Sequence, residues 1–187
     1  MVISSVIHAA DASIPPANAT LLPRGTEAIL GYLGGKTPHV WTVDEWDRFG
    51  HLLQMGIWVP DPSSNPVDQA RLAAEAAHQL GWFRGDLRGI LIDDEANNDP
   101  AFLGEMGLKL REDGYVPLGY ESAGVLNANP RLDGIVLAQP NQEPVVPAGQ
   151  LIIGRQFKWD LVVGDTKIDL DVFDSSTRHL FGRGPRK

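Results

Sequence analysis

Short apolar segments recur along the whole chain and are separated by residues that favour turns. The central segments are almost wholly apolar, which is typical of strands that are covered on both faces. Their lengths and the Gly, Pro, Asn and Asp residues around them also favour strands. We therefore predict about eight strands, over residues 2–8, 28–33, 56–60, 89–93, 116–120, 134–138, 151–156 and 167–173.

Segments with helix-start signals lie between several of these strands. Thr42 and Glu45 have the spacing of a capping box ahead of apolar residues at helical intervals. Two further segments begin with an N-capping residue followed by proline, and they end at Gly81 and Gly114. The helices are predicted over 42–53, 65–81 and 99–114, with a short fourth over 122–127.

Alternating strands and helices predict an α/β fold with parallel strands. Eight strands favour a closed barrel of the TIM type, although 187 residues are few for eight full units, which take about 250. Three links (12–26, 139–150 and 157–166) are rich in Pro and Gly or too short for a helix. We expect a compact TIM-like (β/α) barrel with four or five helices, whose last two strands could form a hairpin. The competing fold is an open doubly wound sheet, but residues 31–35 lack the spacing of a nucleotide-binding loop.

The length and composition fit one globular domain, with 43% hydrophobic and 21% charged residues. We assign residues 1–176 to the barrel and 177–187 to a flexible tail. That tail is basic, with Arg178, Arg183, Arg186 and Lys187. Such a tail is either a solvated terminus or a docking segment for an acidic partner, such as another virion or cell-surface protein.

Several classes of function are disfavoured. The net charge of −8 argues against general nucleic-acid binding, which needs a basic face. No apolar run approaches the roughly 20 residues of a membrane span, and the first ten residues lack the features of a secretion signal. The absence of cysteine excludes disulfides and thiolate chemistry. Localisation stays open, with a phage virion or the bacterial cell wall as the two expectations.

The strand over residues 89–93 ends in an acidic cluster of Asp93, Asp94 and Glu95. Residues two apart on a strand share a face, so Asp93 and Glu95 are expected to point the same way. Neighbouring carboxylates repel each other, and one of them then holds its proton more tightly. This arrangement suits acid catalysis of glycosidic bond cleavage. The alternative is structural, because strands often end in an acid that begins a loop or caps a helix.

Barrels of this type carry their active sites at the carboxyl ends of the strands. Carboxylates, amides and aromatic rings are predicted to gather there, a combination that binds sugars. The candidate acids are Asp11, Asp93, Glu95 and Asp169, and Asp171 lies on the strand that carries Asp169. The candidate substrate contacts are Tyr32, Trp58, Tyr120, Gln139 and Gln156. Trp58 and Tyr32 could instead be ordinary core residues.

We predict neither a metal site nor a cofactor. The five histidines are scattered and form no paired helical ligand motif. Asp93, Glu95 and Asp169 could hold a divalent cation through oxygen ligands, but nothing further in the sequence favours it. No serine lies in a nucleophile elbow, so a nucleophilic triad has no support.

Four segments, in this order along the chain, resemble motifs of one enzyme family. They are 10–13 (Ala-Asp-Ala-Ser), 92–95 (Ile-Asp-Asp-Glu), 118–122 (Leu-Gly-Tyr-Glu-Ser), and 155–157 (Arg-Gln-Phe) with 168–173 (Ile-Asp-Leu-Asp-Val-Phe). Together they resemble the glycoside hydrolase family 25 lysozymes, or muramidases. The segment 31–35, with Trp46 and Gly56, is similar to the related glycoside-hydrolase-like domains of actinobacteria and their phages. The resemblance spans nearly the whole chain.

The resemblance implies a barrel of eight strands with fewer helices than usual. It also implies cleavage of peptidoglycan after N-acetylmuramic acid. Glu95 would be the general acid and Asp93 its carboxylate partner, which orients a substrate N-acetyl group or stabilises positive charge at the sugar. Asp11 and Asp169 would complete the acidic floor. The implied partner is therefore peptidoglycan or another bacterial glycan.

Three departures from the family pattern motivate a second hypothesis. Residues 136–141 replace a Trp-x-Ala-x-Tyr segment, Phe157 replaces a tyrosine, and Asp94 replaces an apolar residue between the key acids. A chain with these changes could keep the barrel without its chemistry. The alternative function is thus a non-catalytic glycan-binding or structural module of a phage virion or cell surface.

Overall fold

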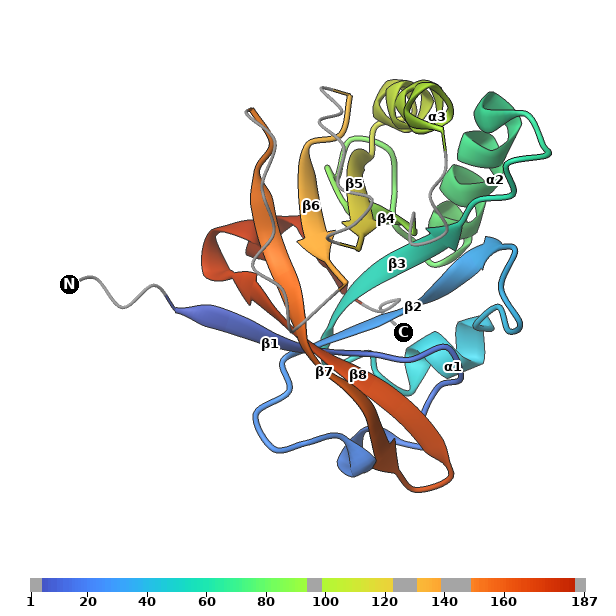
Figure 1. The fold of residues 1–187 in the computed structure, drawn as a ribbon. Coiled ribbons are helices and arrows are strands. Elements are labelled where there is room, and N and C mark those ends of the chain that lie inside the picture. Colours follow the sequence, from blue (N-terminus) through green and yellow to red (C-terminus); the bar gives the residue numbers. More distant parts are fainter. Residues whose placement is uncertain (1–4, 94–98, 123–130, 139–148, 184–187) are drawn as a thin grey trace.

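In the computed structural model of the chain, residues 5–93, 99–122, 131–138 and 149–183 are described, and eight of their strands close into a barrel (Figure 1). The eight strands are β1 (Val6–Asp11), β2 (Ala28–Gly35), β3 (Leu53–Val59), β4 (Gly89–Asp93), β5 (Val116–Glu121), β6 (Gly134–Leu137), β7 (Ile152–Val163) and β8 (Thr166–Asp174). A further two-residue strand, β9 (Gly182–Arg183), pairs with β3. The α/β barrel predicted from the sequence is confirmed.

Parallel and antiparallel pairing are divided along the barrel. Strands β1 to β7 are parallel to their sequential neighbours, whereas β8 is antiparallel to both β7 and β1. The reason lies in the last connection, since only a tight turn at Gly164 separates β7 from β8 and such a link makes a hairpin. Because β8 returns to β1, the sheet has no open ends of the kind that a doubly wound fold requires.

Within the described residues, the helical elements are three α-helices and two 3-10 helices. They are α1 (Val43–Asp47), α2 (Pro66–Gln79), α3 (Pro100–Glu112), η1 (Ala19–Leu21) and η2 (Ser175–Leu180). The predicted caps form: Thr42 and Glu45 make a capping box, and Asn65 accepts from the first N–H groups of α2. None of these helices is long and apolar enough to cross a membrane.

Two helix predictions differ from the structure or lie outside it. The sequence placed the first helix over 42–53, but α1 ends at Asp47 and Leu53 already begins β3. Leu53 pairs with Ala28 of β2, so the backbone bonds of the sheet replace those of a longer helix. The short helix predicted over 122–127 falls almost wholly outside the described residues.

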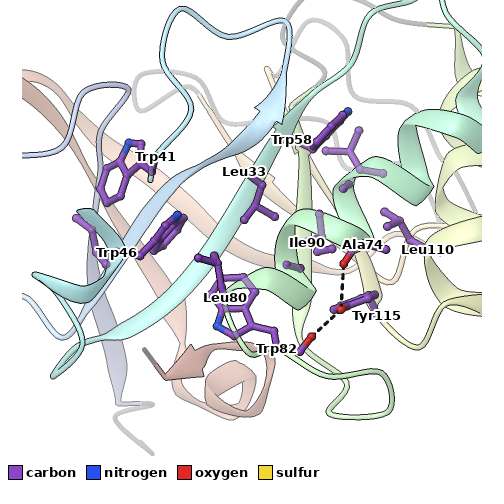
Figure 2. Packing of buried hydrophobic residues seen from close by; sticks show 14 of the residues in the cluster. Leu33, Trp41, Trp46, Trp58, Ala74, Leu80, Trp82, Ile90, Leu110 and Tyr115 are labelled. Atoms are coloured by element: carbon purple, nitrogen blue, oxygen red, sulfur yellow. Dashed lines mark hydrogen bonds between the residues drawn. The ribbon is translucent and has the colours of Figure 1, made fainter. Parts of the chain in front are cut away.

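Two buried clusters lie on opposite sides of the strands. One fills the barrel and includes Ile7, Leu30, Met55, Ile57 and Leu91. The other lies between the barrel and its helices, where Trp41, Trp46 and Trp82 pack in series with ring centroids 4.9 and 5.6 Å apart (Figure 2). Figure 2 also shows Tyr115, whose hydroxyl donates to the carbonyl oxygens of Ala74 and Trp82. The outer cluster thereby fixes α2 and the loop after it against the barrel.

The residues after 176 are part of the folded domain as far as Arg183. Leu180 and Phe181 are buried in the cluster that fills the barrel, near the start of β4. Arg88 donates to the carbonyl oxygens of His179 and Phe181 and so ties this segment to the barrel. Residues 177–183 therefore do not form the flexible tail that we expected from residue 177 onward. Residues 184–187 lie outside the described residues.

The β7–β8 hairpin is longer than the sequence predicted. Strand β7 runs on to Val163, through a segment that we expected to be a link. Because β7 is parallel to the preceding strands, its last residues project beyond the carboxyl ends of the barrel (Figure 1). The Thr166 hydroxyl donates to the carbonyl oxygen of Ile14 at 2.9 Å, which fastens the end of the hairpin to the loop after β1.

Candidate functional site

Three of the four predicted acids meet at the carboxyl end of the barrel. Asp11, the last residue of β1, pairs in register with Asp169 of β8. Asp93 ends β4, and its charge acts on Asp11. A fourth carboxylate, Asp171, lies on the same face of β8 as Asp169 and is fully buried. Parallel pairing brings the carboxyl ends of β1 and β4 to one rim, and the antiparallel strand β8 brings Asp169, in its first half, back to the same rim.

The environment of Asp11 and Asp169 favours their protonated forms. Burial raises the pKa of Asp11 well above its ordinary value, and the neighbouring charges of Asp171, Asp169 and Asp93 raise it further. A hydrogen bond from the Tyr120 hydroxyl acts in the opposite direction on the pKa of Asp11. Burial also raises the pKa of Asp169, against the hydrogen bonds that this carboxylate accepts. The barrel mouth can therefore hold a carboxylic acid in its neutral form.

A chain of hydrogen bonds orients the carboxylates. The side-chain nitrogen of Gln156 donates to the Tyr120 hydroxyl at 2.8 Å and to Oδ2 of Asp169 at 3.0 Å. The side-chain oxygen of Gln156 accepts from the indole Nε1 of Trp159. Because an indole N–H can only donate, this bond fixes which end of the amide faces Tyr120. The Tyr120 hydroxyl oxygen accepts the hydrogen bond from Gln156, so the Tyr120 hydroxyl donates its own proton in the hydrogen bond with Asp11.

An open pocket of about 240 Å³ lies over this network. Its lining residues are Asp11, Tyr32, Tyr120, Gln156, Trp159, Asp160 and Asp169. Five of the seven were predicted from the sequence as acids or substrate contacts. Trp159 and Asp160 were missed because the sequence assigned their segment to a link, and Asp171 was noted on its strand without a site role. The sequence did offer one indication of a site role for Trp159, since it lies three residues after Gln156, a predicted substrate contact.

The remaining predicted residues lie elsewhere or outside the described residues. Trp58 lies in the outer cluster, where its Nε1 donates to Oε1 of Gln69 at 3.3 Å, and it does not line the acidic pocket. Glu95 and Gln139 fall in segments that are not described. In the described part of the chain, no three His, Asp or Glu side chains are arranged to hold a metal ion.

A larger pocket of about 620 Å³ lies between α2 and α3, on the helical side of the barrel. Its Asp113 is buried and bridges Lys109 at 3.0 Å and Arg84 at 3.1 Å. The pair with Arg84 joins the end of α3 to the loop that follows α2, and the pair with Lys109 lies within the end of α3. Both explain the charged lining in structural terms. None of the predicted site residues lines this pocket, so its size does not make it the site of the acid chemistry.

Comparison with known proteins supports the fold. The sequence matches no protein family and no curated protein. Among solved structures, an uncharacterized B. stearothermophilus protein is 16% identical with a TM-score of 0.75, over 94% of this chain and 100% of that one. The autolysin LytC from Streptococcus pneumoniae is 9% identical with a TM-score of 0.67, over 90% of this chain and 46% of that one.

The CTP1L endolysin is 12% identical with a TM-score of 0.64, over 89% of this chain and 65% of that one. The chain thus spans less than two thirds of the length of the endolysin and about half that of LytC. LytC has also been solved in complex with a synthetic peptidoglycan ligand. At these identities the likeness establishes the fold. The chain therefore has the same barrel fold as these autolysin and endolysin structures, in agreement with the fold that the sequence resemblance predicted.

Proposed function

We propose that the protein is a peptidoglycan-directed glycoside hydrolase that works at the carboxyl end of its barrel. The observation that carries the proposal is the meeting of Asp11, Asp93, Asp169 and Asp171 at one rim, where burial and like charge raise the pKa of Asp11. Crowding carboxylates in this way costs stability, so their presence favours a functional role. Glycosidic bond cleavage uses such pairs, one neutral and one ionised.

In the proposed reaction, Glu95 donates its proton to the glycosidic oxygen as the bond to the sugar carbon breaks. Asp93, two residues earlier at the end of β4, remains ionised and orients the N-acetyl group or stabilises the positive charge that develops on the ring. Water then supplies a hydroxyl group to the sugar carbon and returns a proton to the site. Asp11 and Asp169 shape the acidic floor beneath the sugar.

The roles of the polar and aromatic side chains differ from one another in this proposal. Tyr32 and Tyr120 line the pocket and contact the sugar. Gln156 already uses both ends of its amide on Tyr120, Asp169 and Trp159, so it positions these groups. Gln139 remains a proposed sugar contact from the sequence. Peptidoglycan as the substrate is supported by the fold shared with LytC, whose structure has been solved with such a ligand.

A second candidate is a glycan-binding module without catalysis. It is favoured by Phe157, which stands where the resembling lysozymes have a tyrosine and does not line the acidic pocket. The same barrel mouth would then hold a sugar by stacking and hydrogen bonding, with no bond broken. A virion or cell-surface protein of this kind would bind cell walls and release no sugar fragments.

The test is the release of reducing sugar ends from purified bacterial cell walls of several compositions. We expect wild type to release them and Glu95→Gln to be slower by about 100-fold or more, as for loss of a general acid. Glu105→Gln, on the exposed face of α3, is the matched control and should equal wild type. If wild type and both variants are equally inert but bind the walls equally well, the hydrolase is ruled out and the binding module is correct.

A further inference from the structure

We infer that Trp159 is a glycan-stacking residue: its ring forms one wall of the acidic pocket and receives the apolar face of a pyranose ring. The inference rests on the proposed function, because it concerns how the same pocket recognises its glycan. It adds a contact that lies in none of the sequence motifs.

Trp159 differs from every other tryptophan of the chain. All five tryptophans lie in described segments, and Trp41, Trp46, Trp58 and Trp82 are buried, with at most 5% of each side chain exposed. Trp159 is 46% exposed although it lies beside a polar pocket. Burying so large a ring is favourable, so an exposed indole at the edge of a pocket indicates a surface that is covered when a ligand binds.

The ring is held in place by its own polar edge. The indole Nε1 donates to the side-chain oxygen of Gln156, whose nitrogen is bonded to Tyr120 and Asp169. Trp159 is thereby tied to the acidic floor through a single amide. An aromatic wall that is oriented before the ligand arrives loses less conformational freedom on binding than a freely rotating side chain.

The backbone beside Trp159 is also specialised. Asp160 has a φ of +52°, in the left-handed region that residues other than glycine rarely adopt. Its N–H donates to Oδ1 of Asp169 at 2.8 Å, and its carboxylate pairs with Lys167 at 3.1 Å. Register shifts occur on both sides of Lys158, so the hairpin is bulged where Trp159 leaves it. Bulges of this kind re-aim side chains and are common next to active sites.

The small volume of the acidic pocket indicates how its polar floor and the Trp159 ring share the binding of one sugar. At about 240 Å³ the acidic pocket is smaller than typical ligand pockets, which begin at roughly 300 Å³. It suits a single sugar ring, and its carboxylates and Tyr32 can bind hydroxyl groups at the edge of that ring. The faces of a pyranose carry C–H groups, and these pack well on an indole. Polar floor and aromatic wall therefore recognise different parts of one sugar.

Phe157 provides a matched control. It lies two residues before Trp159 on the same strand and is similarly exposed, at 43%, but it does not line the pocket. An aromatic residue that merely tolerates exposure on the hairpin would behave like Phe157. If Trp159 stacks on the glycan, a bound sugar should reduce the exposure of Trp159 and leave that of Phe157 unchanged.

The first test uses iodide quenching of tryptophan emission, with an N-acetylglucosamine tetramer and a soluble muramyl tetrasaccharide as probes. Because the other four tryptophans are buried, iodide should quench mainly Trp159, and Trp159→Phe should lose most of the quenchable emission. We expect a bound probe to lower the quenching constant severalfold in wild type and in Phe157→Ala. If calorimetry shows a probe binding while iodide still reaches Trp159 as before, this inference is overturned and the proposed function stands. If neither probe nor whole cell walls bind, both are overturned.

The second test measures the dissociation constant of the same probes. Trp159→Ala should weaken binding about tenfold, and Phe157→Ala should change it less than twofold. Circular dichroism establishes that both variants are folded. Equal affinities for wild type and a folded Trp159→Ala would refute the inference, and the quenching experiment on wild type decides the matter if that variant does not fold.

Discussion

Asp11 and Asp169 lie directly opposite each other on the antiparallel strands β1 and β8. Side chains in such a pair have Cβ atoms roughly 4.5–5.5 Å apart, and like charges at that separation are destabilising. Burial raises the pKa of both carboxyls, and Asp171 and Asp93 add further negative charge beside Asp11. A pair of carboxylates that destabilises the fold in this way is typical of a site whose function uses their negative charge.

Replacing Asp11 by asparagine should stabilise the fold at neutral pH. The folded-state pKa of Asp11 lies above its unfolded value of about 3.9, so the penalty for ionising this group is fully present above the folded pKa and absent below the unfolded one. We expect Asp11→Asn to gain on the order of 1 kcal/mol at pH 7, and the gain to shrink as pH falls towards 4. Urea unfolding between pH 4 and 8 measures it.

The matched control for this variant is Asp165→Asn, in the exposed turn of the hairpin. It removes the same charge without relieving any buried crowding, so its effect should be small and should vary little with pH. A loss of stability at pH 7 in Asp11→Asn would contradict the electrostatic account of the pocket.

Removal of the Tyr120 hydroxyl should raise the pKa of Asp11 further, because the hydrogen bond from Tyr120 favours the ionised carboxylate. In Tyr120→Phe, Asp11 should therefore stay protonated to a higher pH than in wild type, and NMR titration of its carboxyl carbon measures this. The lost hydrogen bond should cost about 0.5–1.5 kcal/mol of unfolding free energy.

Tyr115→Phe serves as the comparison for Tyr120→Phe. The Tyr115 hydroxyl donates to the carbonyl oxygens of Ala74 and Trp82, far from the acids, so the variant should lose stability and leave the titration of Asp11 unchanged. The chain of hydrogen bonds from Gln156 through Tyr120 to Asp11 would be contradicted if both variants shifted the pKa of Asp11 equally, or if neither variant shifted it.

Truncation should show where the folded domain ends. A chain that stops at residue 176 loses the buried side chains Thr177, Leu180 and Phe181, whereas one that stops at 183 keeps every described contact. We expect the first to unfold or to aggregate and the second to melt within a few degrees of the full chain. Phe181→Ala should cost about 3–5 kcal/mol, as for other buried phenylalanines. Thermal unfolding followed by circular dichroism distinguishes these cases, and a stable chain ending at 176 would restore the flexible tail.

Trp58→Phe should affect stability rather than glycan binding. Trp58 packs in the outer cluster and bonds to Gln69, so its loss leaves a cavity and a broken hydrogen bond worth about 1–3 kcal/mol together. Its affinity for the muramyl tetrasaccharide should match wild type. A selective loss of affinity with unchanged stability would instead support the sugar contact that the sequence predicted.

The element types and the rim on which Asp11 and Asp93 meet follow from local sequence patterns. Buried apolar strands alternating with capped helices require parallel strands, and parallel strands bring Asp11 and Asp93 to one end whatever the details of packing. The capping residues Thr42 and Asn65 fix helix starts through local hydrogen bonds, which is why those starts were predicted correctly.

Which side chains enter the pocket depends on long-range packing within the closed barrel. Strand β3 is buried on both faces, so burial cannot tell that Ile57 faces into the barrel and Trp58 faces the helices. The placement of Trp159 depends on bulges that shift the pairing of β7 with β8, and such shifts arise from cross-strand contacts that no local pattern encodes. Phe181 likewise gains its place only because the closed barrel leaves an end to be covered.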